Sequence, residues 1–260
     1  MKNHRDLSVR LFRGLASCLL AASLHPAWGS TPEVEALIVQ GDAQVKAMRS
    51  PEALVLFEQA AKADPGNADI LLRISQQYSN LIAQAKSPDE ALQDAQRSLD
   101  AARQAVALAP ENSKAHLALS VAYGRITDFV DNRTKIEDSR QVKAEAEKTL
   151  QLDPNDDIAY HVLGRWNYRV ATLNPVLKLI ARFVYGGMPD ASLEEAVRDY
   201  QKAIEIAPQR VIHHHELARV YEALGQTDDA RKEWETELTL TPEDNEGVND
   251  IKEARASLGR

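Results

Sequence analysis

The sequence predicts an all-α fold, an α-solenoid of about five helical hairpins, some elongated, closed by a C-terminal capping helix. Three observations support this prediction. The composition favours helix, because Ala, Leu, Glu, Gln and Asp dominate while Gly and Pro number only 11 each in 260 residues. Five segments ending in proline recur, and each proline closes a helix-like stretch just before another begins. The last two of these prolines are separated by the period of a known helical-hairpin repeat, about 34 residues.

Residues 1–29 are expected to be a signal peptide, which leaves residues 30–260 as a single repeat domain. The apolar run "GLASCLLAASL" is too short to span a bilayer, and Ala27 and Gly29 are the small residues expected just before a cut at Ser30. We therefore predict an exported, periplasmic protein. Lipid anchoring at Cys18 is the less favoured alternative, because only four residues separate Arg13 from Cys18. The basic residues that open this segment are Lys2, Arg5, Arg10 and Arg13.

Charge and cysteine content exclude several classes of function. Without residues 1–29 the chain has 27 basic and 38 acidic residues, a net charge near −11, so we expect no nucleic-acid binding. The only cysteine, Cys18, leaves with the signal peptide. The remaining chain then has no disulfide, no thiol nucleophile and no cysteine metal ligand, and we expect neither a cofactor nor a metal.

The internal repeats end in "KADP", "ALAP", "QLDP", "EIAP" and "TLTP", at Pro65, Pro110, Pro154, Pro208 and Pro242. Only the last interval has the tetratricopeptide period, and the three earlier intervals are longer. The last unit resembles a tetratricopeptide repeat, through Leu217, Ala218, Tyr221, Gly225, Ala230, Trp234 and Pro242. The first unit matches through Gly41, Ala53, Phe57, Ala60 and Pro65, and the fourth through Leu163, Gly164, Ala196, Tyr200, Ala203 and Pro208.

Close packing explains the pattern, because small residues let two helices approach to about 8–10 Å while large ones fill the gaps. Glu237 stands where a small residue is usual, so we expect looser packing there. Four aromatic residues are assigned to the core: Tyr78, Tyr123, Tyr221 and Trp234.

The first two intervals exceed the tetratricopeptide period by about three helical turns each, and we expect both helices of the second and third hairpins to be lengthened. Ser50, Ser87 and Ser192 are predicted N-caps, the last two in capping boxes. After Pro242, "NEGVNDIKEARASLGR" predicts the capping helix.

The fourth unit contains an insertion between its helices, "ATLNPVLKLIARFVYGGMPD". It predicts a short helix with Lys178 and Arg182 on one side. We expect its apolar side to pack on the solenoid. The alternatives are a lid over the groove and a membrane-associated adaptor acting through residues 174–186, although two cations and so short a helix argue against membrane contact. The apolar side consists of Val176, Ile180, Phe183 and Val184.

Three stretches of the C-terminal half carry a family resemblance: "HVLGRWNYRVATLNP", "YGGMPDASLEEAVRDYQKAIEIAP" and "ELARVYEALGQTDDARKEW". They resemble the regulator of microtubule dynamics proteins, a tetratricopeptide-like family, over roughly residues 64 to 260. The resemblance includes the insertion in the fourth unit. It implies a helical protein that interacts with other proteins, and it supplies no catalytic residues. The microtubule role is not carried over, because an exported chain would meet no microtubules.

Motifs for catalysis are absent: the sequence has no phosphate loop, no G-x-G-x-x-G, no H-E-x-x-H and no G-x-S-x-G. His213, His214 and His215 cannot converge on one metal ion within a helix, because successive residues point about 100° apart. We expect His214 to pack inside and the other two to be partly exposed. The paired carboxylates of the chain stand at helix starts, where they complement the helix dipole.

The candidate binding site is a histidine and arginine pair that occurs twice, once in the fourth unit and once in the fifth. In each pair the two residues are four apart and share a helix face. We predict that these side chains line the concave groove and bind a partner protein or peptide through an acidic group. Alternatively, the arginines pair with Glu216 or Glu222, or the chain is an accessory subunit or enzyme acting on a small anionic ligand. The predicted site consists of His161, Arg165, Arg169, His215, Arg219 and Arg125.

Overall fold

The computed structural model describes residues 30–186 and 190–259, so the predicted signal peptide and Cys18 lie outside the described residues. The described residues form helices and no strand. The helices are α1 (Pro32–Lys46), α2 (Ser50–Ala63), α3 (Ala68–Ile82), α4 (Pro88–Leu108), α5 (Ser113–Ile126), α6 (Asn132–Leu152), α7 (Asp157–Ala171), α8 (Pro175–Tyr185), α9 (Leu193–Ile206), α10 (Val211–Ala223), α11 (Thr227–Glu237) and α12 (Asn245–Ser257).

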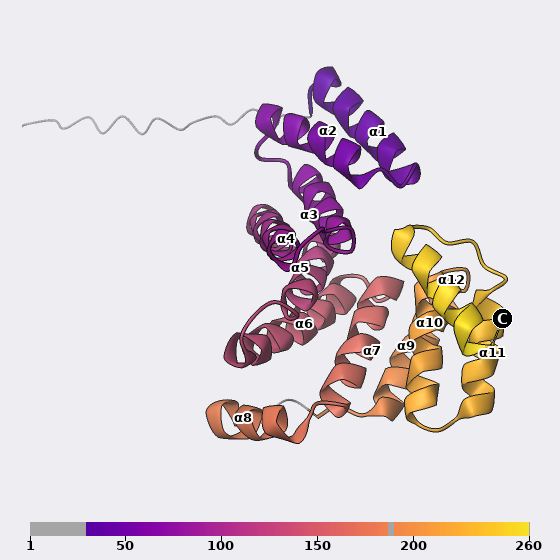
Figure 1. Cartoon of the computed structure of the whole chain (residues 1–260). Helices are drawn as coiled ribbons and strands as arrows, with labels where there is room; N and C mark the ends of the chain where they lie inside the picture. Colours follow the sequence, from indigo (N-terminus) through magenta and orange to yellow (C-terminus); the bar gives the residue numbers. More distant parts are fainter. Residues whose placement is uncertain (1–29, 187–189, 260) are drawn as a thin grey trace, which may run out of the picture.

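Five helical hairpins stack into an arc, which confirms the predicted all-α solenoid (Figure 1). The hairpins are α1–α2, α3–α4, α5–α6, α7–α9 and α10–α11, and α8 is inserted between the two helices of the fourth. The second helix of each hairpin packs against the first helix of the next, as in other helical-repeat proteins. The C-terminal α12 packs on α10 and α11, on the inner side of the arc (Figure 1).

The elongated hairpins differ from the prediction, because only their second helices are long. Helices α4 and α6 have 21 residues each, whereas α3 has 15 and α5 has 14. The expectation that both partners share the extra turns is therefore wrong. The helix caps explain this result: Ser87 and Asp131 start the second helices about six turns before the closing proline of each repeat, so those helices take all the added length.

Two of the three predicted serine caps are present. Ser87 Oγ accepts a hydrogen bond from Glu90 N at 3.2 Å, and Ser192 Oγ accepts one from Glu195 N at 3.0 Å. Ser50 is not a cap, because it lies inside α2 and the preceding Arg49 makes no side-chain cap bond.

Small residues opposite aromatic rings set the spacing within the hairpins. A Cβ atom added at Gly41 would lie 2.3 Å from Phe57 Cε1, and one at Gly164 would lie 3.0 Å from Tyr200 Cδ2. Only glycine allows these helices to approach so closely. Of the aromatic residues assigned to the core, Trp234 and Tyr78 are buried, whereas Tyr123 and Tyr221 are half-buried at the edges of core clusters.

Helix α8 does not bury the apolar side that the sequence indicated. Of the predicted apolar side, Val176 and Phe183 are 64% and 79% exposed, Ile180 is half-buried, and the side chain of Val184 lies outside the described residues. The neighbouring Leu179 is 55% exposed. Instead Ala181, on the opposite side of the helix, is buried, and α8 touches the solenoid at α6. The helix is rotated so that its small residue faces the solenoid, which corrects the expected core packing. In the described part of the chain, no helix combines the length and apolar character needed to cross a membrane.

Candidate protein-binding site

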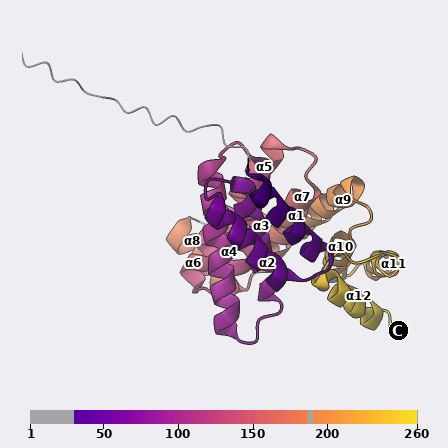
Figure 2. The same cartoon turned by 90° about the horizontal axis from the view of Figure 1, so that it is seen from above.

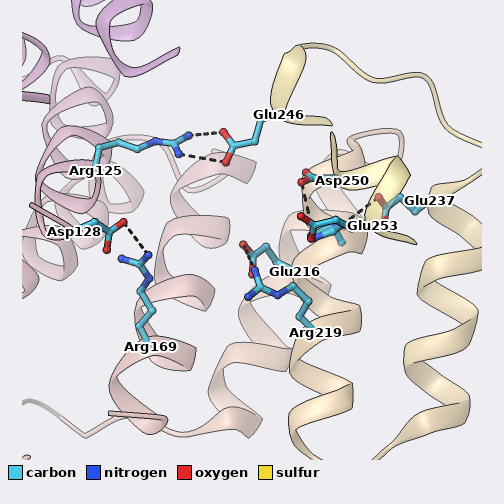
Figure 3. A network of polar contacts seen from close by, with 10 residues as sticks. Arg125, Asp128, Arg169, Glu216, Arg219, Glu237, Glu246, Asp250 and Glu253 are labelled. Atoms are coloured by element: carbon cyan, nitrogen blue, oxygen red, sulfur yellow. Dashed lines mark hydrogen bonds and ion pairs between the residues drawn. The ribbon is translucent and has the colours of Figure 1, made fainter. Parts of the chain in front are cut away.

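The predicted arginines lie on the first helices of the last three hairpins, α5, α7 and α10, which neighbour one another along the solenoid. Arg125 is on α5, Arg169 is on α7 and Arg219 is on α10 (Figure 3). The start of α12 faces them from the inner side of the arc, and it brings carboxylates toward the arginines (Figure 3). The predicted arginines therefore come from adjacent hairpins of the solenoid.

Arg125 forms a two-pronged ion pair with Glu246 in the first turn of α12 (Figure 3). Its Nη1 donates to Oε1 at 3.2 Å and its Nη2 donates to Oε2 at 2.5 Å. Although burial acts to raise the pKa of Glu246, Arg125 and Arg165 outweigh that effect and the pKa is lowered. The carboxylate is thus held in its charged form between the arginines.

Two further arginines are also paired within the chain. Arg169 Nη2 lies 3.2 Å from Asp128 Oδ2, and Arg219 Nη1 lies 3.5 Å from Glu216 Oε1 (Figure 3). The pairing of Arg219 with Glu216 was the alternative considered from the sequence. The other residue considered there, Glu222, accepts a hydrogen bond from Trp234 Nε1 at 3.2 Å.

Arg165 is the arginine of the predicted site that forms no ion pair within the described residues. Its side chain is half-buried, and within residues 30–186 and 190–259 no carboxylate oxygen lies within ion-pair distance of it. Burial acts to lower the pKa of Arg165, but the carboxylates of Glu216, Glu246 and Asp128 outweigh it and the pKa is raised. Arg165 is therefore a fixed positive charge, and its hydrogen-bond donors remain available.

His161 is buried in the core and does not line the groove, which corrects the first half of the histidine prediction. The Nδ1 atom of His161 lies 3.1 Å from Nδ1 of His213. The His161 ring packs edge-on against the Tyr200 ring, with 5.2 Å between the two ring centroids. Burial, together with His213 and Arg165, holds the pKa of His161 well below its usual value. His161 is therefore neutral at physiological pH and serves packing.

His215 is buried as well, and carboxylates surround it. Its Nδ1 lies 3.2 Å from Glu237 Oε1, and its Nε2 lies 3.6 Å from Glu253 Oε2 and 3.9 Å from Asp250 Oδ1 (Figure 3). Burial lowers the pKa of His215, but Glu237 and Asp250 outweigh it and the pKa is raised. Burial raises the pKa of Asp250 to about 7.

This cluster also corrects two expectations from the sequence. Glu237 is fully buried against His215, so a charged residue fills the place of the usual small one and the expected loose packing is absent. His213 and His215 were expected to be partly exposed, yet both are buried together with His214. In the described ranges, no group of three or more His, Cys, Asp or Glu residues is arranged to hold a metal ion.

In two hairpins a buried histidine contacts both a glutamate and the carbonyl oxygen of a repeat-closing proline, an arrangement that the sequence analysis did not predict. In the last hairpin His214 Nδ1 lies 2.7 Å from Glu233 Oε2 and Nε2 lies 3.0 Å from the Pro208 carbonyl oxygen. In the third, His116 makes the same contacts, with Glu145 at 2.6 Å and with the Pro110 carbonyl at 2.8 Å. The signal was available, since each histidine stands six residues after the closing proline of a repeat.

A cavity of about 410 Å³ lies in the C-terminal half of the solenoid. None of the arginines of the predicted site lines it. It lies among α6, α7 and the start of α9, and carboxylates dominate its charged lining, including Glu147, Glu195 and Asp199. Burial raises the pKa of Asp199 to about 6. Such a lining does not suit an acidic ligand, so the arginine surface remains the candidate site.

The stacked helical hairpins define a tetratricopeptide-like α-solenoid, a class of fold that offers extended surfaces for binding other proteins. Residues 37–259 match the family described as Regulator of microtubule dynamics protein 1-3. The chain belongs to this family. The match confirms the resemblance that the sequence carries.

Similar proteins include three mammalian members of the family. The chain is 26% identical to mouse regulator of microtubule dynamics protein 2, over 74% of this chain and 48% of that protein. It is 26% identical to rat protein 3, over 100% of this chain and 57% of that protein. It is 25% identical to mouse protein 1, over 72% and 60% of the two chains. The chain thus spans about half the length of the relatives it matches.

Solved structures support the fold alone. A thermophilic tetratricopeptide protein from Thermus thermophilus has a TM-score of 0.65 and 15% identity, over 87% of this chain and 100% of the other. MamA from Desulfovibrio magneticus has a TM-score of 0.50 and 15% identity, over 82% and 97% of the two chains. Both are similar in the stacking of their helices.

Proposed function

We propose that the protein is an interaction scaffold that binds an acidic group of a partner protein through the arginines of α5, α7 and α10. The observation that carries the proposal is Arg165, a half-buried arginine with no ion pair in the described structure, surrounded by arginines that each hold a carboxylate. A helical-repeat fold offers extended surfaces of this kind for protein partners.

Electrostatics supports the choice of an acidic ligand. A carboxylate arriving about 4 Å from an arginine gains roughly 4 kcal/mol at an effective dielectric constant near 20, before the cost of desolvation is subtracted. The ion pair between Arg125 and Glu246 supports this choice, because a carboxylate of the chain itself binds one of these arginines. A partner carboxylate would bind Arg165 with Glu216 and Glu246 as its intramolecular competitors.

The proposal includes the absence of enzymatic activity and the location of the protein. Helical-repeat folds of this kind offer surfaces for binding, and no catalytic motif occurs in the sequence. The sequence of residues 1–29 supports export, and we propose that the scaffold works in the periplasm.

The test is crosslinking followed by mass spectrometry in native cells, with the wild-type chain, an Arg165→Ala plus Arg219→Ala variant and a matched control. Arg97→Ala plus Arg103→Ala removes the same charge from α4, where both side chains are exposed. We expect one partner to be captured by the wild type and the control and to be lost with the double variant at an unchanged melting temperature. Carboxylate-to-amide substitutions in the crosslinked segment of the partner should reproduce the loss.

Equal capture by all three proteins would refute the arginine site. Turnover of a small anionic compound by the purified chain, without any partner, would instead favour the enzyme alternative.

A further inference from the structure

Helix α8 carries an exposed apolar stripe that the scaffold function does not use. Val176, Leu179 and Phe183 are three and seven residues apart and therefore share one face of the helix. The other large hydrophobic side chains that are exposed in the described structure, such as Val39 and Leu108, stand singly on different helices. Isolated exposed apolar residues need no explanation, whereas three on one face of a helix that also carries cations have the pattern of an interfacial helix.

Both views place α8 at the periphery of the molecule. It lies beneath α6, outside the arc of hairpins, in Figure 1, and at the edge of the molecule in Figure 2. Ala181 anchors it to the solenoid, so the stripe points away from the protein. A flat surface can therefore reach this face without disturbing the arginine site.

The charge of α8 is opposite to that of the chain. The protein has a formal net charge of −8, yet α8 contains Lys178 and Arg182 and no acidic residue. Both cations are exposed, and neither lies in an ion pair within the residues that the structure describes, although Lys178 Nζ donates a hydrogen bond to the Ala171 carbonyl. Cations elsewhere on the surface, such as Arg198, pair with a carboxylate on their own helix. The charges of the α8 cations thus remain available to negative groups outside the chain.

The size of the stripe argues against a protein partner. An 11-residue helix is about 16 Å long and about 10 Å wide, so one face covers roughly 160 Å². A specific protein interface needs about 800 Å² from each partner. A lipid surface has no such requirement, because apolar side chains insert one by one and adjacent cations meet anionic headgroups.

We propose that α8 is a docking helix for an anionic membrane surface, lying in the plane of the bilayer with its Val176, Leu179 and Phe183 face among the lipids. Lys178 and Arg182 lie to one side of the stripe, at the level of the headgroups. The helix is too short to cross a bilayer, so the contact is peripheral and reversible. The scaffold would then present its arginine surface to partners close to a membrane.

The experiment uses the full chain with vesicles of phosphatidylcholine, with or without phosphatidylglycerol. Residues 1–29 contain their own apolar run, so the readout must be specific to α8. A Phe183→Trp variant places a fluorophore on the stripe. We expect the tryptophan emission of this variant to shift to shorter wavelength when anionic vesicles are added. The Phe183→Ser variant is the reference, because it keeps the same three native tryptophans and lacks the one at position 183.

Sedimentation with vesicles measures the strength of binding. Leu179→Ser plus Phe183→Ser should weaken binding at least about tenfold, since both apolar anchors are lost. Arg182→Gln should weaken it about fivefold, the effect of one cation near an anionic surface. The matched control is Val55→Ser on α2, because Val55 is 54% exposed and stands outside the stripe. It should bind as the wild type does.

Three results would overturn the proposal. The first is an unchanged emission spectrum of Phe183→Trp with the anionic vesicles. The second is equal binding by the stripe variant and the Val55→Ser control. The third is self-association that Phe183→Ser abolishes while vesicle binding is absent, which would assign the stripe to a second copy of the chain. Circular dichroism of each variant verifies that the fold is intact.

Discussion

Replacing Gly164 by alanine tests the helix packing that positions the adjacent Arg165. The new methyl group would lie 3.0 Å from two ring carbons of Tyr200. Carbon atoms in contact prefer about 3.5–4.0 Å, and Tyr200 is fully buried and has no free space to move into. Such overpacking costs about 1–3 kcal/mol, while alanine gains about 1 kcal/mol of helix propensity over glycine. We therefore expect a net loss of about 0–2 kcal/mol in the free energy of unfolding.

Gly124→Ala on α5 is the matched control. Its new methyl group would lie 3.9 Å from Val142 Cγ2, an ordinary contact, so only the gain of about 1 kcal/mol from helix propensity applies. Urea unfolding followed by circular dichroism should therefore separate the two variants by about 1–3 kcal/mol. In the Gly164→Ala background, Tyr200→Leu should be less damaging than it is alone, because the smaller side chain relieves the clash. If Gly164→Ala were as stabilising as Gly124→Ala, the close approach of α7 and α9 would be refuted.

Three other predictions follow from buried groups. Trp234→Ala should lower the free energy of unfolding by about 3–5 kcal/mol, and an unchanged melting temperature would contradict its burial. Asp250 and His215 should contribute stability that is lost as the pH rises toward and through about 7, because the folded state raises the pKa of Asp250 to about 7 and also raises that of His215, and both therefore favour folding in the protonated form. Asp250→Asn should make the melting temperature less dependent on pH between pH 3.8, the ordinary pKa of aspartate, and about pH 7. A pH dependence equal to that of the wild type would count against this prediction. Ser98→Ala should lower the free energy of unfolding, measured in urea, by about 1–3 kcal/mol. In its buried site, Ser98 Oγ donates a hydrogen bond to the Ser75 carbonyl oxygen at 2.9 Å and shares one with Ser79 Oγ at 2.8 Å. A loss smaller than the error of the measurement would contradict this prediction.

The histidine and arginine pairs show how far sequence reasoning reaches at the site. The spacing of four residues placed each histidine on the same side of its helix as its arginine, but it could not say how deeply that side is buried. Burial depends on neighbouring helices: Tyr200 of α9 and His213 of α10 enclose His161, whereas Arg165 one turn later is only half-buried. The pattern of one helix contains no information on those neighbours.

The ion pair between Arg125 and Glu246 was outside the reach of the sequence, because 121 residues separate the two. Small rotations between successive hairpins add up along a solenoid, and their sum brings the start of α12 opposite α5. The orientation of α8 was likewise a matter of tertiary structure, since the helix turns Ala181 toward α6 and leaves its larger apolar residues exposed.

The sequence by itself determined the helical hairpins, the place of the insertion and the small residues against which aromatic rings pack, because these features follow from periodicity and contacts within a repeat. Only the tertiary structure decided which helices took the extra turns, which side of α8 faced outward and which carboxylates met the arginines. These outcomes depend on how separate hairpins rotate and stack. A residue's position along its own helix does not specify that arrangement.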